Sequence, residues 1–144
     1  MAGRVLVSAL TAVSLPALLS LMRAIEAERL PDDPDAPERA EAEVRRSLSR
    51  FDFTQPGSCR MLLAMVDDAA AGYALAVRIP KLDARVGFLF VEELYVLGAY
   101  RRAGVASALL RECESVAQAW GLPGIRLLVR PENESARQLY RRSG

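Results

Sequence analysis

Three consecutive patterns in the second half of the chain constrain its fold more than any other feature. Residues 85–96 form the longest apolar, β-branched and aromatic run, which only Glu92 and Glu93 interrupt. Apolar residues then recur at helical spacing over residues 104–120, and a short apolar run at residues 125–129 predicts a buried strand. A strand, a helix and a strand in this order form a right-handed crossover between two parallel strands. The sequence therefore predicts an α/β fold.

The rest of the chain supplies the remaining elements of one domain. We expect strands at residues 4–8, 59–66 and 72–79, a helix that Ser14 caps at its N-terminus, a second helix over residues 38–49 and a last helix that Asn133 caps. The first four strands can pair as an antiparallel meander. The prediction is a single domain, residues 1–144, with a mixed central sheet and helices on both faces.

The N-terminal segment allows two interpretations. Arg4 followed by the apolar residues 5–21 is typical of a signal peptide. Ser14 and Pro16 interrupt the run, which favours a strand, a turn and a helix instead. Nothing else in the chain is long and apolar enough to span a bilayer, so we expect a cytoplasmic protein with no membrane partner.

Composition excludes several classes of function. Nineteen basic and eighteen acidic residues give a net charge of +1, which argues against a strongly basic nucleic-acid binder. The chain has no His, which rules out a Ser-His-Asp triad, a Cys-His nucleophile and a His-ligated metal. Cys59 and Cys113 are too few for a Cys-rich zinc site, so we expect no metal and two buried thiols in a reducing cytosol.

A phosphate-binding loop is predicted where the strand at 85–96 leads into the helix at 104–120. The first N–H groups of a helix have no partner within it, and the helix dipole adds positive potential there. Gly104 and Ala106 would let a ligand approach this backbone closely. The spacing Arg101-x-x-Gly104-x-Ala106 is neither the dinucleotide fingerprint nor a P-loop. The alternative is an ordinary helix start after a loop with solvated arginines.

A second pattern begins the last predicted helix. It reads Asn133-x-x-Ala136-x-x-Leu139-Tyr140. Taken alone, this pattern indicates a capped amphipathic helix whose Leu139 and Tyr140 belong to the core.

Together, the two patterns resemble the acetyl-CoA signature of the GNAT superfamily of N-acetyltransferases, and the order of elements matches over residues 4–144. Residues 91–96, and residues 72–75 in the strand before them, resemble the diamine (spermidine/spermine) acetyltransferase group. Ala106 stands where Gly is commoner in the family. The family continues with two more strands beyond Gly144, so this chain is expected to lack them. Either the natural protein is longer or a second copy pairs at the edge left by residues 125–129, as a homodimer.

The resemblance implies a role for each matched residue. Glu92 would act as the general base, with Glu93 as the alternative, and Tyr140 would protonate the departing thiolate. Backbone groups of the strand would hold the pantetheine arm, loop amides the pyrophosphate, and the last helix would flank the pantetheine. The residues expected to bind acetyl-CoA are Leu94, Tyr95, Val96, Arg101, Arg102, Ala103, Gly104, Val105, Ala106, Ser107, Asn133 and Ala136.

The chemistry and the charge pattern favour a small cationic acceptor. An alkyl ammonium, of pKa about 10.4, must lose a proton before it attacks a thioester, and a carboxylate can accept that proton. Residues 99–144 carry eight Arg and four Glu, a net +4 that suits a polyphosphate, whereas residues 26–43 carry eight acids and two Arg, a net −6. That acidic segment shapes the acceptor site in the family, although it would also suit a solvated surface. The alternatives are a protein or peptide N-acetyltransferase and a non-catalytic acyl-CoA-binding module.

Overall fold

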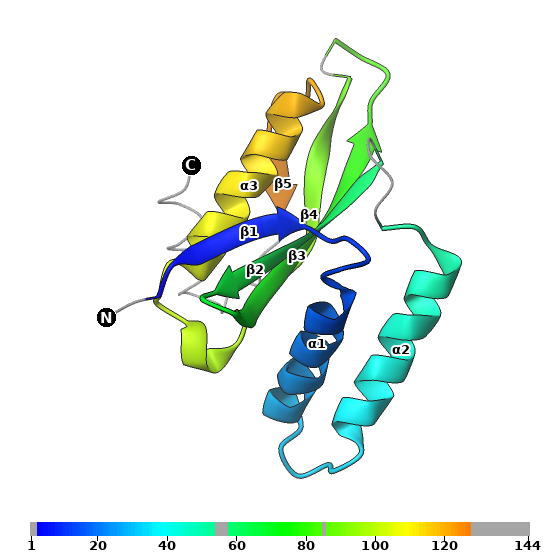
Figure 1. Ribbon diagram of the computed structural model, residues 1–144. Coiled ribbons are helices and arrows are strands. Elements are labelled where there is room, and N and C mark those ends of the chain that lie inside the picture. Colours follow the sequence, from blue (N-terminus) through cyan, green and yellow to red (C-terminus); the bar gives the residue numbers. More distant parts are fainter. Residues whose placement is uncertain (1–2, 54–57, 85, 128–144) are drawn as a thin grey trace.

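The protein folds around one five-stranded mixed sheet. The computed structural model describes residues 3–53, 58–84 and 86–127 (Figure 1). The elements follow in the order β1 (Val5–Ala9), α1 (Leu15–Arg29), α2 (Ala36–Arg50), β2 (Cys59–Val66), β3 (Ala69–Pro80), β4 (Gly87–Val96), a 3-10 turn (Gly98–Tyr100), α3 (Val105–Ala119) and β5 (Ile125–Leu127). The strands lie in the order β1-β2-β3-β4-β5. The first four pair antiparallel, and β4 pairs with β5 in parallel. This confirms the predicted α/β class, the meander and the parallel crossover.

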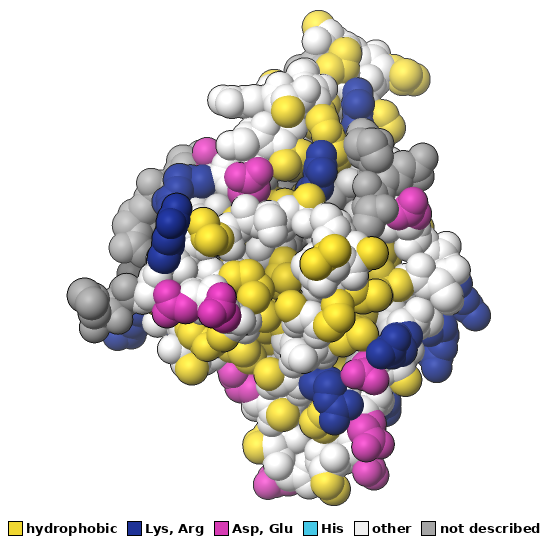
Figure 2. Space-filling view, viewed as in Figure 1, with side chains coloured by type: hydrophobic (Ala, Val, Ile, Leu, Met, Phe, Trp, Pro, Cys, Tyr) yellow, Lys and Arg dark blue, Asp and Glu magenta, His cyan; other side chains and the backbone are white. Residues whose placement is uncertain are grey.

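Each face of the sheet is covered by its own helices, and each has its own core. On one face, Leu109 and Cys113 of α3 pack with Leu62 and Leu89 of the sheet. On the other, α1 contributes Leu18, Leu21 and Ile25, which pack against Met61, Leu63, Tyr73 and Leu75. The alternation of Met61 and Leu63 with Leu62 follows from the two-residue period of a strand. Figure 2 shows hydrophobic side chains gathered at the centre of one face, with charged side chains around them.

The N-terminal segment forms a strand, a turn and a helix. β1 pairs with β2 from Val5 to Ala9, one residue later than expected at each end. Ser14 precedes α1, but its side chain does not cap the helix as expected. Its hydroxyl instead donates to the Thr11 carbonyl and accepts from the Thr11 amide, at 3.2 and 2.9 Å, which closes the preceding turn. Within the described residues, no helix is both long and apolar enough to cross a membrane.

Several predicted boundaries were wrong by a few residues. Helix α2 begins at Ala36 rather than residue 38, because Pro37 fits the first turn of a helix, where no amide is needed. Strand β3 extends from the predicted 72–79 to Ala69–Pro80, because it continues to pair with β2 as far as Val66. Strand β4 begins at Gly87 rather than residue 85. Val86, directly before it, has a φ of 55°, which is not an extended-strand value.

Strand β5 is less buried than expected. Ile125 and Leu127 are half-buried, and Arg126 between them is exposed, with its guanidinium carbon 4.1 Å from the centre of the Phe88 ring. The predicted remainder of this strand and the predicted last helix fall in residues 128–144, outside the described part of the chain.

Both cysteines are free and buried, as predicted. Cys59 is 1% exposed on β2, and Cys113 is fully buried on α3. Burial raises the pKa of both thiols, and that of Cys113 rises to about 12. Since the thiolate is the reactive form, both side chains act as small apolar groups of the core.

Candidate active site

A β-bulge in β4 coincides with the two glutamates that interrupt its apolar run. Leu75 of β3 pairs with Glu93, but the next residue of β3, Ala76, pairs with Val91. Glu92 is therefore the extra residue of β4. A bulge adds one unpaired residue, bends its strand and is common beside active sites.

The bulge changes which face of the sheet each later residue of β4 meets. Before it, Leu89 and Val91 pack in the core under α3; after it, Leu94 and Val96 do so. Tyr95 packs instead in the core under α1, as does Leu75, the cross-strand partner of Glu93. If side chains alternated regularly along the whole of β4, Val91, Glu93 and Tyr95 would share one face. The bulge therefore turns Glu93 and Tyr95 toward α1.

The bulge also lies directly beyond the described pairing of β4 with β5. That pairing joins Leu89 to Ile125, Phe90 to Arg126 and Val91 to Leu127. The second half of β4 continues past the bulge, by way of Leu97, into the 3-10 turn and then toward α3. The carboxylates and the helix start thus lie along one continuous stretch of backbone.

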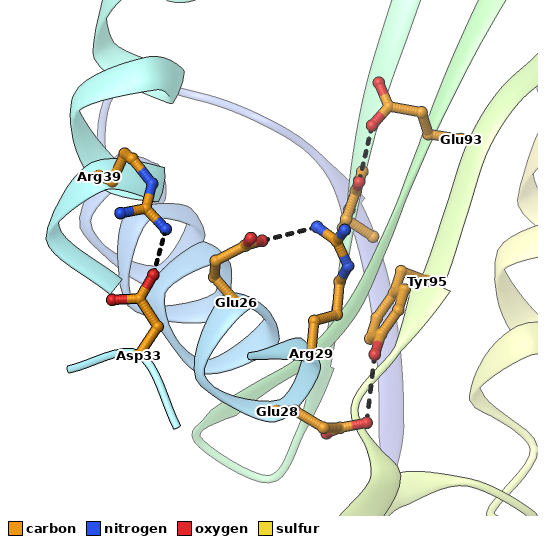
Figure 3. Close-up of polar contacts among 8 residues, drawn as sticks. Glu26, Glu28, Arg29, Asp33, Arg39, Glu93 and Tyr95 are labelled. Carbon is orange, nitrogen blue, oxygen red and sulfur yellow. Dashed lines mark hydrogen bonds and ion pairs between the residues drawn. The ribbon is translucent and has the colours of Figure 1, made fainter. Parts of the chain in front are cut away.

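Glu93 is held by a buried tyrosine. The Tyr73 hydroxyl donates a hydrogen bond of 2.8 Å to Glu93 Oε1 (Figure 3). Tyr73 is 8% exposed, whereas the Glu93 side chain is exposed. Burial, followed by the charge and hydrogen bond of Glu93, raises the pKa of Tyr73 well above its ordinary value of 10.0. Tyr73 therefore stays protonated across the neutral range and can donate its proton to this hydrogen bond.

The start of helix α3 has the backbone geometry that an anion-binding site requires. Gly104 precedes it in a left-handed conformation, with φ of 82° and ψ of 9°, and a Cβ added there would meet no atom within 4 Å. The first helical hydrogen bond joins the Ala108 amide to the Gly104 carbonyl at 3.0 Å. The amides of residues 105–107 thus have no partner within the helix, and no side chain in the described part of the chain caps them. No acidic residue stands in this first turn, so free amides and open space fit a phosphate group.

Arg101 does not extend from this loop as a free cation. Its Nη2 donates to Glu28 Oε1 at 3.0 Å and to the Tyr95 hydroxyl at 3.3 Å, and its Nε donates to the Val96 carbonyl at 3.1 Å. Glu28 stands in the last turn of α1 and was not among the predicted site residues. No local signal could have found it, because its partners lie 67 to 73 positions further along the chain.

Further acidic residues lie at the same end of α1. Glu26 accepts from Arg29 at 2.8 Å, and Arg29 is close enough to Tyr73 to oppose the rise in its pKa (Figure 3). Asp33, in the loop after α1, accepts from Arg39 at 2.7 Å, and this bond lowers the pKa of Asp33. The acidic segment at residues 26–43 therefore brings part of its charge to the face that Glu93 shares, while neighbouring arginines pair with several of its carboxylates.

The predicted site residues fall into two groups. Glu92 and residues 94–96 lie on β4 at and beyond the bulge, and residues 101–107 form the loop and the first turn of α3. The predicted residues of the last helix, Asn133, Ala136 and Tyr140, lie outside the described residues.

Comparisons with known proteins agree with this geometry. The family model for the Acetyltransferase (GNAT) family matches residues 19–144. An N-acetyltransferase of Mycobacterium tuberculosis, described as uncharacterized, is 30% identical over 113 residues, which are 76% of this chain and 69% of the relative.

Two solved structures share the fold. An aminoglycoside acetyltransferase from an uncultured soil metagenomic sample has a TM-score of 0.77 at 22% identity, over 98% of this chain and 91% of that chain. A ribosomal-protein-alanine N-acetyltransferase from Brucella melitensis biovar Abortus has a TM-score of 0.67 at 20% identity, over 96% and 89%. The family match and the fold make this chain a member of the GNAT family of acetyltransferases, which use acetyl-CoA as the acetyl donor.

Proposed function

We propose that this chain, as a single domain of residues 1–144, moves an acetyl group from acetyl-CoA to the primary amine of a small cationic acceptor. The observation that carries the proposal is the bulge of β4. It falls at two adjacent carboxylates, Glu92 and Glu93, on the stretch of backbone that leads from β4 to the start of α3, and it turns Glu93 toward α1.

Acetyl-CoA is proposed to bind along the second half of β4 and the loop that follows. Backbone groups of residues 94–96 would pair with the pantetheine arm, and the amides of residues 102–107 would hold the pyrophosphate. The uncapped amides at the start of α3 support this assignment. Asn133 and Ala136 are proposed to flank the pantetheine, on the strength of the family signature alone.

The acetyl transfer is proposed to be direct. A carboxylate on β4 accepts one proton from the ammonium group of the acceptor. The neutral amine then attacks the thioester carbon, a C–N bond forms as the C–S bond breaks, and the nitrogen releases its second proton to solvent. Tyr140 is proposed to give its proton to the leaving thiolate, whose ordinary pKa of about 8.5 demands only a weak acid. The resemblance to the family favours Glu92 as the base. The hydrogen bond from Tyr73 supports Glu93, because a fixed carboxylate needs less reorganisation.

A cationic acceptor is proposed because acidic side chains stand on the face that Glu93 shares. Glu26 in the last turn of α1 and Asp33 in the loop after it lie at this end of the helix (Figure 3). The similar acetyltransferase from the soil metagenomic sample acts on aminoglycosides, as its name states. The resemblance of residues 91–96 to the diamine group points to polyamines, which carry the same kind of charge. The acceptor class is thus a small molecule with more than one ammonium group.

A panel of acceptors tests this function. Release of free thiol from acetyl-CoA is measured with aminoglycosides, polyamines, single amino acids and short peptides, and the Glu92→Gln/Glu93→Gln double variant serves as the control. We expect turnover with polycations and much less with amino acids. Turnover with peptides alone would establish the protein N-acetyltransferase alternative instead. Binding of CoA in calorimetry without turnover on any amine would identify a non-catalytic module.

A further inference from the structure

We infer that Glu28 of α1 is a positioning residue for acetyl-CoA, which it serves by fixing the end of β4 and the loop before α3. The inference rests on the proposed acetyl-CoA site. It assigns a role to a residue that neither the cofactor signature nor the acceptor chemistry requires.

One carboxylate joins three groups that lie far from it in the chain. Glu28 Oε2 accepts from the Gly98 amide at 2.9 Å. Glu28 Oε1 accepts from Arg101 Nη2 at 3.0 Å and from the Tyr95 hydroxyl at 3.2 Å. Arg101 in turn donates to the Val96 carbonyl at 3.1 Å. The end of β4 and the start of the loop before α3 are therefore held by hydrogen bonds to the same side chain.

The packing at Gly98 shows how closely the loop lies against this carboxylate. A Cβ added at Gly98 would stand 3.2 Å from Glu28 Oε1, which is tighter than ordinary van der Waals contact. The 3-10 turn at Gly98–Tyr100 then closes with a hydrogen bond of 3.3 Å from the Arg101 amide to the Gly98 carbonyl. Only residues 101–104 separate this turn from α3, so a shift at Gly98 moves the first amides of the helix.

The same contacts indicate a role for Arg101 that differs from the expected contact with acetyl-CoA. Its guanidinium stands 5.6 Å from the centre of the Tyr95 ring and donates to three oxygens on the protein. A guanidinium engaged in this way orders the loop rather than contacting a phosphate. Arg102, the next residue, adopts a left-handed conformation with φ of 65° that turns the chain toward Gly104. Glu28 thus acts on the cofactor through Arg101 and the loop backbone.

Calorimetric titration of the whole chain with CoA tests the inference. Glu28→Ala should weaken CoA binding about tenfold, since it removes hydrogen bonds from an amide and a guanidinium. Glu28→Gln keeps an oxygen that can accept from Gly98, and it should restore part of the affinity. Glu41→Ala is the matched control. Glu41 has the same 32% side-chain exposure as Glu28, and it pairs with Arg23 and Arg45 away from the loop. Its CoA affinity should equal that of the wild type.

Kinetics and a double variant separate positioning from direct contact. Glu28→Ala should raise KM for acetyl-CoA and leave KM for the amine within about twofold, and Arg101→Ala should do the same. The Glu28→Ala/Arg101→Ala double variant should be no worse than either single one, because each residue acts through the other. If the two losses multiply, Arg101 contacts the cofactor independently and the inference is overturned.

Two other results would also overturn the inference. One is a Glu28→Ala variant that binds CoA like the wild type. The other is a rise in KM for the amine alone, which would make Glu28 an acceptor-binding group. If Glu28→Ala does not fold, the CoA affinities of Glu28→Gln and Glu41→Gln are compared instead. The inference expects a loss of affinity in Glu28→Gln only. Failure of the wild type to bind CoA would instead refute the proposed function on which the inference rests.

Discussion

The Tyr73 hydroxyl of β3 donates a 2.8 Å hydrogen bond to Glu93 of β4, and the two side chains meet although they do not face each other directly in the strand register. Tyr73 pairs with Tyr95 and Glu93 pairs with Leu75, so the contact is diagonal. A long side chain can reach a diagonal neighbour on the same face of a sheet. The contact therefore depends on the bulge, which turns Glu93 to the face that carries Tyr73.

Removal of this hydroxyl should impair turnover more than folding. We expect Tyr73→Phe to lower kcat/KM for the amine about tenfold, because Glu93 loses the bond that orients it. Affinity for CoA should not change, and stability should fall by only about 1 kcal/mol because the ring stays in the core. Steady-state kinetics, calorimetry and urea denaturation measure the three quantities. In a Glu93→Gln background, adding Tyr73→Phe should have little further effect on kcat/KM. A full tenfold loss there would exclude Glu93 as the group through which Tyr73 acts.

Exchange of each glutamate identifies the base. The variant of the catalytic residue, Glu92→Gln or Glu93→Gln, should lose most of its turnover at neutral pH. It should recover part of that turnover near pH 10, where more of the amine is already neutral. The other variant should stay within about threefold of the wild type at all pH values. Rates measured from pH 7 to pH 10 distinguish the two, and equal losses that do not depend on pH would contradict a base at either position.

A charge at the start of α3 should abolish CoA binding. Gly104→Asp places a carboxylate where the phosphate must approach, and we expect CoA affinity to fall at least about 100-fold. Gly121→Asp is the control, because Gly121 also has a positive φ, of 71°, and open space around it, but follows the other end of α3. Each change should cost about 1 to 2 kcal/mol of stability through the left-handed backbone. Calorimetry should separate them, and equal CoA affinity in both would remove the phosphate site from this helix.

The raised pKa of Tyr73 makes a prediction about alkaline stability. The folded state binds the phenol proton more tightly than the unfolded state, whose tyrosine titrates near its ordinary value of 10.0. The stabilisation is fully present below that pH, and it is lost as pH rises from there through the raised pKa. The difference in free energy of unfolding between wild type and Tyr73→Phe should therefore shrink from pH 9 to pH 11. Urea denaturation at both values measures it, and a constant difference would show that Tyr73 is not buried as described.

Periodicity predicted most of the fold and little of the site geometry. The boundaries of β2, the helical face of Leu109 and Cys113, and the parallel crossover all follow from local patterns of apolar residues. The bulge does not, because an extra residue is defined only by the register with β3. The interruption at Glu92 and Glu93 marked its place without revealing which side chain would turn toward α1.

The contacts of Glu28 could not be predicted for a related reason. Nothing in the sequence around α1 distinguishes Glu28 from Glu26, which pairs with Arg29 within the same helix. The partners of Glu28 depend on how α1 lies across the sheet, and that is decided by Leu18, Leu21 and Ile25 in the core. Ser14 is the opposite case, in which a clear local signal was misleading. Its residue type and position predicted a helix cap, but its side chain forms hydrogen bonds with Thr11 in the preceding turn.

The buried thiols have a practical consequence for anyone who measures this enzyme. A disulfide reagent such as an aromatic dithiobis compound reacts with exposed thiolates, so it would detect released CoA and not the folded protein. Cys59 and Cys113 become reactive only when the chain opens. The same reagent, used without acetyl-CoA, would then count two thiols per molecule as the protein unfolds. One colorimetric reaction thus reports both turnover and the integrity of the core, and it allows an inactive variant to be told apart from an unfolded one in a single plate.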